Sequence, residues 1–418
     1  MKGLFAIFTL EFRALVRSRA LAILLGLSVL WMFVMPFVVK SDGSDEGARQ
    51  MYVEYALGGV FALTLVALTA SAAGTLAKDR TGRRLALTLV RPVASCTVAL
   101  GRIAALSFGG AAVLAVATGI LALRSDLRRP CDHVLSPLME SPRTEAERMY
   151  EVFLHDPDTP KEVLEAKRED VVRILTQRAA EHYQSIPTNA TASWSFEVPD
   201  AAAKGPFAVR LRFTNMYDMR EDVAGRFSFG GLSGEIRDVT KAVTRIALTG
   251  TAEARAQELV FANEGKGELM LRPRRDIQLL AEADGFGWNL LRAYLELVAV
   301  LTVALSVAVF LGAGLGRSTA VFTAVTLLVI ATVSPAVMEE CPQELDTARG
   351  DRIGLALTRF AAAVTAPLTA VSPLEHLAAD ECLETDEFVR TLAVDFVLFP
   401  LVFALLSAAV LPRKGEEA

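Results

Sequence analysis

Two apolar stretches, at 55–77 and 98–123, are separated by a short and strongly basic run. Each stretch is long enough to cross a bilayer, because a membrane helix needs about 20 apolar residues. The run between them, KDRTGRRLALTLVRPVAS, carries five basic residues and a single acidic one, Asp79. Short loops rich in Lys and Arg stay on the cytoplasmic side of a membrane. The pattern therefore predicts a membrane protein that holds this basic loop, residues 78–97, in the cytoplasm.

The basic loop is predicted to contain a short helix of its own, with apolar positions at Leu85, Leu87, Leu89 and Val90 and a stop at Arg91-Pro92. A structured element held on two membrane helices suits a protein that receives force or signal from a soluble partner. The candidate contact residues are Lys78, Asp79, Arg80, Arg83, Arg84, Leu85, Leu87, Leu89, Arg91 and Pro92. Alternatively, these cations only set the topology and contact lipid phosphates.

The composition agrees with a membrane protein, since 52% of the 418 residues are hydrophobic and the mean hydropathy is +0.38. The net charge of −5 gives no reason to expect a nucleic-acid partner. We predict an α-helical polytopic protein with six spans, three within 1–123 and three within 287–418: Ala20–Val39, Tyr55–Ala77, Val98–Leu123, Trp288–Gly312, Thr319–Met338 and Val389–Leu411. Both termini then lie in the cytoplasm, because every short loop assigned there is basic.

Residues 2–19 are predicted to form an amphipathic helix in the inner membrane interface, with one apolar face and one basic face: Leu4, Phe5, Phe8, Phe12, Leu15 and Val16 against Lys2, Thr9, Arg13 and Arg17. A cleaved signal peptide is the alternative. It is disfavoured because the charged region is too long and the next apolar segment has the length of a span.

The large insert at 124–286 is predicted to form an extracytoplasmic α+β domain, helical over 142–184 and β-rich over 192–280. Apolar residues alternate with others from Phe207 to Phe213, as in a half-buried strand. Further short strands are expected at Ser193–Val198, Arg226–Phe229, Ala242–Thr249, Glu258–Ala262 and Gly267–Leu271. We therefore expect a helical stalk that carries a β-sandwich.

A second outer segment, residues 339–388, is predicted to be re-entrant or interfacial. A seventh span over Ile353–Leu374 is possible by length, but it would place the basic C-terminus outside. This topology puts Cys96 inside and three cysteines outside, which permits one disulfide, with Cys341–Cys382 as one possible pair beside Cys131. Unpaired, buried cysteines are the alternative.

Arg292, Glu296 and Asp395 are ionisable residues within predicted spans. A charge at the centre of a membrane costs about 2.5–3.5 kcal/mol, so each is expected to have a partner or to face water. They could line a polar substrate path or outer gate. A structural ion pair is the simpler interpretation, either between Arg292 and Asp395 or between Arg292 and Glu296.

The sequence favours neither a metal site nor catalysis. His376, Asp380, Glu381 and Cys382 lie within seven residues, but acidic loops often bring such types together and no second cluster supports a metal site. No nucleophile–base or paired-carboxylate arrangement is present in the sequence, and no GxxxxGK[ST] motif occurs. We therefore expect a chain that is not an enzyme and that holds no cofactor and no metal.

Three stretches occur in an order that resembles the permease subunits of type-2 ABC exporters, most closely the six-helix branch with the gliding-motility and nitrous-oxide-reductase accessory permeases. LFAIFTLEFRALVRSRA looks like that family's interfacial elbow helix. AKDRTGRRLALTLVRPVASCTVALGR looks like its cytoplasmic loop, and LTAVSPLEHLAADECLETDEFVRTLAVDFVLFPLVF is similar to its last part. The insert is larger than the simplest members carry, so its role does not follow from the resemblance.

The resemblance implies a permease in the inner (plasma) membrane that binds no nucleotide itself. Two copies of a separate ATPase subunit would supply the energy, and a second permease chain would complete the transporter within the lipid. A different class of function stays open. The chain could be a membrane-anchored sensor or binding protein that acts through its extracytoplasmic β-domain.

Overall fold

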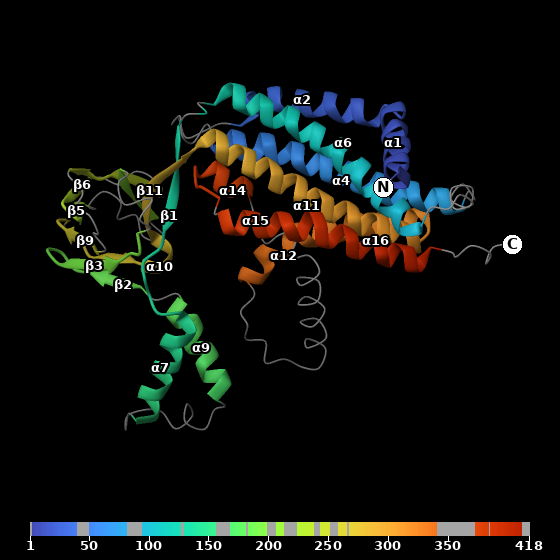
Figure 1. Cartoon of the computed structure of the whole chain (residues 1–418). Coiled ribbons are helices and arrows are strands. Elements are labelled where there is room, and N and C mark those ends of the chain that lie inside the picture. Colours follow the sequence, from blue (N-terminus) through green and yellow to red (C-terminus); the bar gives the residue numbers. More distant parts are fainter. Residues whose placement is uncertain are drawn as a thin grey trace. The chain divides into compact units, whose positions relative to one another are not determined.

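The computed structural model describes residues 2–39, 50–81, 94–125, 127, 129–155, 168–180, 183–198, 206–212, 224–237, 243–250, 258–265, 267–340, 373–383 and 385–411. The chain divides into two compact units. The helical unit comprises Met1–Arg129 and Gly285–Ala418, and the β-rich unit comprises Pro130–Asp284. Figure 1 shows both units, coloured along the sequence.

The helical unit is built from these helices in chain order: α1 (Lys2–Arg17), α2 (Ala20–Val38), η1 (Tyr52–Leu57), α4 (Gly58–Thr81), α6 (Ser95–Arg124), α11 (Phe286–Gly314), α12 (Arg317–Glu340), α14 (Pro373–Ala378), α15 (Thr385–Ala393), η3 (Val394–Leu398) and α16 (Phe399–Val410). The segments η1 and η3 are single π-helical turns within longer helices. Such turns are rare and are frequently found at functional sites.

Five of these helical segments are long and apolar enough to cross a membrane: Ala20–Val38, Tyr52–Arg80, Ser95–Arg124, Phe286–Gly314 and Phe388–Val410. They correspond to five of the six predicted spans, so the chain has the make-up of a polytopic membrane protein. Helix α12 has 24 residues, but its described apolar part covers only Arg317–Ala331. The sixth span therefore stays a prediction. Nearly all of the candidate seventh span, Ile353–Leu374, lies outside the described residues.

Helix α11 is the centre of the helical unit, and it packs against α4, α6, α12 and α16 (Figure 1). Its close approach to α4 requires a glycine. A Cβ atom added at Gly312 would lie 2.6 Å from the carbonyl oxygen of Ala73 and 3.2 Å from the Cβ of Leu76. The absence of a side chain at Gly312 therefore lets the two backbones touch.

The β-rich unit contains two larger antiparallel sheets. The first has the strand order β1–β11–β4–β7 and the second β3–β9–β5–β6–β8, with a separate pair β10–β2. The strands are β1 (Pro130–Leu135), β2 (Gln184–Ile186), β3 (Thr191–Ser195), β4 (Phe207–Arg212), β5 (Ala224–Phe229), β6 (Leu232–Arg237), β7 (Val243–Ala247), β8 (Thr249–Gly250), β9 (Glu258–Asn263), β10 (Leu269–Leu271) and β11 (Ile277–Gly285).

Both sheets contribute to one hydrophobic core. The ring of Phe207 on β4 meets the ring of Phe229 on β5 edge-on at 5.2 Å, which joins the first sheet to the second. Within the second sheet, Phe227 and Phe261 lie 4.5 Å apart. The strand expected at 207–213 is present as β4, and Phe207, Val209 and Leu211 are buried as predicted. The expectation that the strand is only half-buried is wrong, because Ala208 and Arg210 on its other face are buried as well. Two sheets around a shared core have the arrangement of a sandwich.

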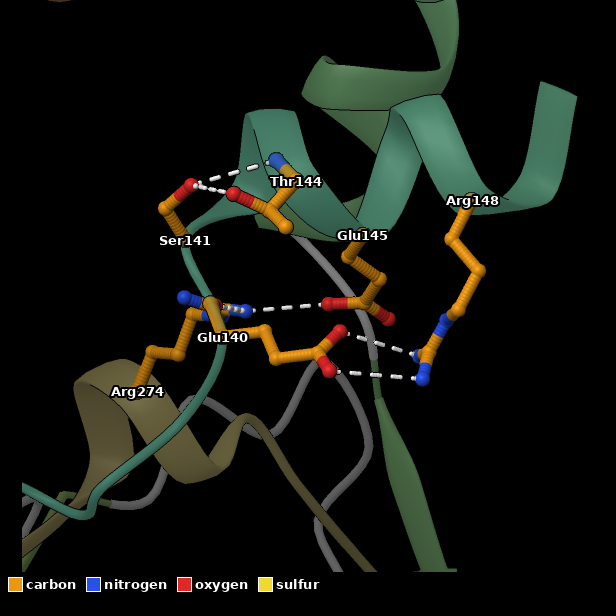
Figure 2. Close-up of polar contacts among 6 residues, drawn as sticks. All are labelled: Glu140, Ser141, Thr144, Glu145, Arg148 and Arg274. Atoms are coloured by element: carbon orange, nitrogen blue, oxygen red, sulfur yellow. Dashed lines mark hydrogen bonds and ion pairs between the residues drawn. The ribbon is translucent and has the colours of Figure 1, made fainter. Parts of the chain in front are cut away.

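A pair of helices, α7 (Pro142–His155) and α9 (Arg168–Ala180), has a small core of its own. Figure 2 shows how the start of α7 is held. Arg274, on the short helix α10 (Pro273–Asp276), donates to the carboxylate of Glu145 at 2.9 Å and to the Glu140 carbonyl. Ser141 caps the helix by accepting from the Thr144 backbone N–H at 3.1 Å. These contacts tie α7 to the β-rich core.

The cysteines occur in two states. Cys131, on β1, and Cys382, after α14, are each disulfide-bonded, whereas Cys96 at the start of α6 is a free thiol. The alternative in which all the cysteines are unpaired is therefore wrong for Cys131 and Cys382. Cys341 lies outside the described residues.

We predict that Gly312→Ala lowers the thermal stability of the membrane-embedded chain, because the new methyl group forces α11 away from α4. Overpacking of this kind typically costs about 1–3 kcal/mol. The matched control is Gly119→Ala on α6, where an added Cβ meets nothing within 4 Å. Thermal unfolding in detergent checks this, and equal midpoints for the two variants would contradict the close contact.

Candidate functional site

The basic loop starts from the last turn of α4, and this turn is the candidate functional site. Helix α4 continues to Thr81, four residues beyond the predicted end of the span at Ala77. Lys78, Asp79 and Arg80 therefore lie on the helix rather than in a loop, and α6 begins again at Ser95. The remaining predicted contact residues lie outside the described residues and stay a prediction: Arg83, Arg84, Leu85, Leu87, Leu89, Arg91 and Pro92.

Asp79 takes part in a buried cluster of charges that joins three helices. The Nη2 atom of Arg102 on α6 lies 2.6 Å from Oδ2 of Asp79 and 2.6 Å from Oε1 of Glu11 on α1. We call Glu11, Asp79 and Arg102 the charge triad. The Arg102 side chain is only 5% exposed, against 26% for Asp79 and 19% for Glu11. A buried cation needs such partners, because removing a charge from water without them is costly.

Both ion pairs of Arg102 use the same nitrogen of its guanidinium group, Nη2. Among the described residues, the buried Nε and Nη1 atoms of Arg102 have no hydrogen-bond acceptor. A buried donor without an acceptor costs about 1–3 kcal/mol, and more when the group is charged. The triad therefore holds its three helices together while leaving part of the arginine's bonding capacity unused.

Arg80, the next residue, contacts the end of a different helix, α11. Its guanidinium group donates to the carbonyl oxygen of Leu315 at 2.8 Å and also to that of Ala313. These carbonyls lie at the end of α11 and in the turn that leads to α12. A cation there satisfies helix-end carbonyls and interacts favourably with the negative end of the helix dipole. Asp79 thus joins the end of α4 to α6 and, through Arg102, to α1, while Arg80 joins it to the end of α11 and to the turn before α12.

Helix α1 is fixed on α6 by apolar packing as well as by Glu11. The Ile7 side chain fills the space over Gly101, where an added Cβ would lie 2.7 Å from its Cγ2. Leu15 does the same over Gly109, and the Phe12 ring meets Phe108 edge-on at 5.4 Å. Phe5 and Leu10 remain exposed, at 68% and 58%. Helix α1 therefore has an apolar surface left over for lipid, as expected for an interfacial helix.

The predicted intramembrane residues occupy a different part of the helical unit. Arg292 donates to the Leu383 carbonyl at 2.9 Å and stacks on Trp288, with its Cζ 5.5 Å from the ring centre. Glu296 is buried on α11, and Asp395 is buried in the π-helical turn η3. Within the described part of the chain, no ion pair or hydrogen bond joins Arg292 to Asp395. The structure therefore does not bring those two residues together as a pair.

The group considered for metal binding makes contacts of other kinds. His376 Nδ1 lies 2.8 Å from Glu381, and Asp380 forms a 3.3 Å ion pair with Arg129. Cys382 is in a disulfide. In the described ranges, no group of three or more His, Cys, Asp or Glu residues is arranged to hold a metal ion.

Sequence reasoning missed three residues that the structure places at central contacts. Glu11 and Arg102 form the charge triad with Asp79. Asn289 on α11 is fully buried, donates to the Glu381 carbonyl at 2.8 Å and accepts from the Leu383 backbone N–H at 2.9 Å. A signal was present for Arg102, since a charge inside a predicted span needs a partner.

No family model, no curated protein and no solved structure matches this chain. The charged contacts at the end of α4 are therefore the observation from which we infer the function.

We predict that Arg102→Met strongly destabilises the helical unit, because Glu11 and Asp79 would face each other without a counter-charge. Removing one partner of a buried ion pair costs about 3–5 kcal/mol. The control is Arg13→Met, which removes an exposed cation from α1 and should change stability by about 0.5 kcal/mol or less. Thermal unfolding of both variants in nanodiscs measures the difference. Similar midpoints would show that Arg102 does not hold the helices together.

Proposed function

We propose that this chain is the membrane-spanning permease subunit of an ATP-driven exporter of the type-2 ABC class. In this proposal a separate ATPase subunit binds the basic loop at 78–97, and two permease chains work with two ATPases in the inner membrane. The chain itself does not hydrolyse ATP. Its substrate is left open.

The observation that carries this proposal is the set of contacts at the end of α4. A loop that only fixes topology needs no connection beyond the two helices that flank it. Here Asp79 binds Arg102 on the other flanking helix, α6, and Arg102 also binds Glu11 on α1, which does not flank the loop. Arg80 adds a second outside connection, to the end of α11 and the turn before α12. Displacement of the loop would thus act on several helices through two neighbouring residues, Asp79 and Arg80.

The same contacts suggest how a movement would travel. Helix α4 packs along α11, with Gly312 against Ala73, so displacement of one helix presses on the other. Interiors this closely packed transmit strain rather than absorb it. Helix α11 carries buried polar residues along its length, including Asn289, Glu296 and Thr302. Movement of α11 would therefore rearrange polar groups inside the bundle.

The cysteines support the side assignment on which the proposal depends. Disulfides form and persist in oxidising compartments outside the cytoplasm. Cys131 and Cys382, which fall on the predicted outer side, are in disulfides, whereas Cys96, at the predicted inner end of α6, is a free thiol.

One observation favours the second candidate function, a sensor or binding protein. The β-rich unit has a complete hydrophobic core of its own, as expected for a part that recognises a ligand independently of transport. The two functions differ in the partner they require, because only the permease needs an ATPase.

The test is co-purification from native membranes. The tagged chain should retain an ATPase that carries a GxxxxGK[ST] motif, and the double variant Arg83→Glu, Arg84→Glu should reduce this recovery about tenfold or more, since each reversal opposes an ion pair. Membrane insertion should be unchanged.

A matched control places two charge reversals elsewhere, as Arg143→Glu with Arg148→Glu on the exposed face of α7. This control should retain the ATPase. Recovery of no ATPase by the wild-type chain would contradict the permease proposal and favour the sensor.

A further inference from the structure

The charge triad distributes its bonds in an unusual way. A guanidinium group presents donors on three nitrogens and matches a carboxylate best when two of them bind its two oxygens in parallel. In the triad a single nitrogen, Nη2 of Arg102, serves both carboxylates at 2.6 Å. Among the residues described, Nε and Nη1 find no acceptor, although both are buried.

We propose that the charge triad is a two-state latch. In the closed state, which the structure shows, Arg102 shares Nη2 between Glu11 and Asp79. In the open state Arg102 forms a two-nitrogen pair with Glu11 alone, and Asp79 turns to water and releases the end of α4. The inference depends on the proposed function only for what drives the exchange, because the two states belong to the chain itself.

The two states are closely balanced in their interactions. Each gives Arg102 two charge-assisted hydrogen bonds, so exchange loses none of them. The closed state crowds two carboxylates around one cation. The open state separates them and gives an acceptor to a donor that has none among the described residues in the closed state. Only the closed state, however, has the ion pair between Asp79 on α4 and Arg102 on α6. A small force on the basic loop could therefore decide between them.

Asp79 rather than Glu11 is the partner that leaves. Asp79 is the more exposed of the two, at 26% against 19%, and lies two residues before the end of α4, where the loop begins. Glu11 is held over α6 by the packing of Ile7 on Gly101 and of Leu15 on Gly109. Release would separate α1 and α6 from α4, and Arg80 would carry the α11–α12 turn along with α4.

The latch predicts opposite effects from two neutral substitutions. Asp79→Asn removes the attraction that closes the latch, so the α4–α6 distance should lengthen. Glu11→Gln leaves Asp79 as the only charged partner of Arg102 within the triad. The mean α4–α6 distance should therefore shorten, or its distribution should narrow. A cluster with a single state would show one α4–α6 distance in the wild type, and Glu11→Gln would leave that distance unchanged because the Arg102–Asp79 pair remains.

The distance can be measured in the chain alone, reconstituted in nanodiscs without any ATPase. Spin labels at Thr75→Cys on α4 and Ala104→Cys on α6 use exposed positions, in a background with Cys96→Ser and Cys341→Ser. Pulsed electron paramagnetic resonance should give two distance populations for the wild-type triad. Asp79→Asn should enrich the longer one and Glu11→Gln the shorter one.

Shifts in the same direction, or one unchanged distance in all three proteins, would overturn the latch. If Glu11→Gln does not fold, the wild-type protein and Asp79→Asn decide together. A single distance population in the wild type, or an unchanged distribution in Asp79→Asn, contradicts the proposal. Since no ATPase is present, this result is independent of the co-purification test. The latch can therefore fail while the permease proposal stands, and the reverse is also possible.

Discussion

A buried guanidinium group without counter-charge is untenable in a bundle of apolar helices, and this constraint organises the end of the helical unit where the basic loop begins. Arg102 requires the carboxylates of Glu11 and Asp79, which come from two other helices. Satisfying one charge thus fixes α1, α4 and α6 relative to one another. Arg80 extends the connection to α11 and α12. The residues at the start of the proposed docking loop are therefore part of the packing between the helices.

The parts that sequence reasoning predicted are those that local patterns specify. Long apolar runs identified the five helices that can span a membrane, and the two-residue period at Phe207–Leu211 identified β4. Strands β1, β2, β6 and β11 were not among the expected ones, and the last two show why. In β6 the buried positions alternate with Ser233 and Glu235, but the middle one is Gly234, which has no apolar side chain to mark the pattern. In β11 the apolar Leu280 breaks the alternation. Pairing with neighbouring strands forms both, and this information lies elsewhere in the chain.

The contacts of the candidate site could not be predicted from local sequence patterns either, because their partners are far apart in the chain. Glu11 and Arg102 are 91 positions apart, and Arg80 meets carbonyls 233 and 235 positions away. Only the fold brings them together. The end of α4 was placed too early because the charges from Lys78 onward resemble a loop. Their partners on α6 and α11 allow the helix to continue with those charges in place. The residues most useful for a functional argument are thus those whose neighbours come from distant sequence.

The permease proposal requires that the basic loop between α4 and α6 faces the cytoplasm. Its most direct test is the accessibility of a single cysteine, Thr88→Cys, in the background with Cys96→Ser and Cys341→Ser. A membrane-impermeant maleimide should leave this cysteine unlabelled in intact cells with a permeable outer envelope, and should label it fully once the inner membrane is opened. Full labelling in the intact cells would place the loop outside and contradict the account.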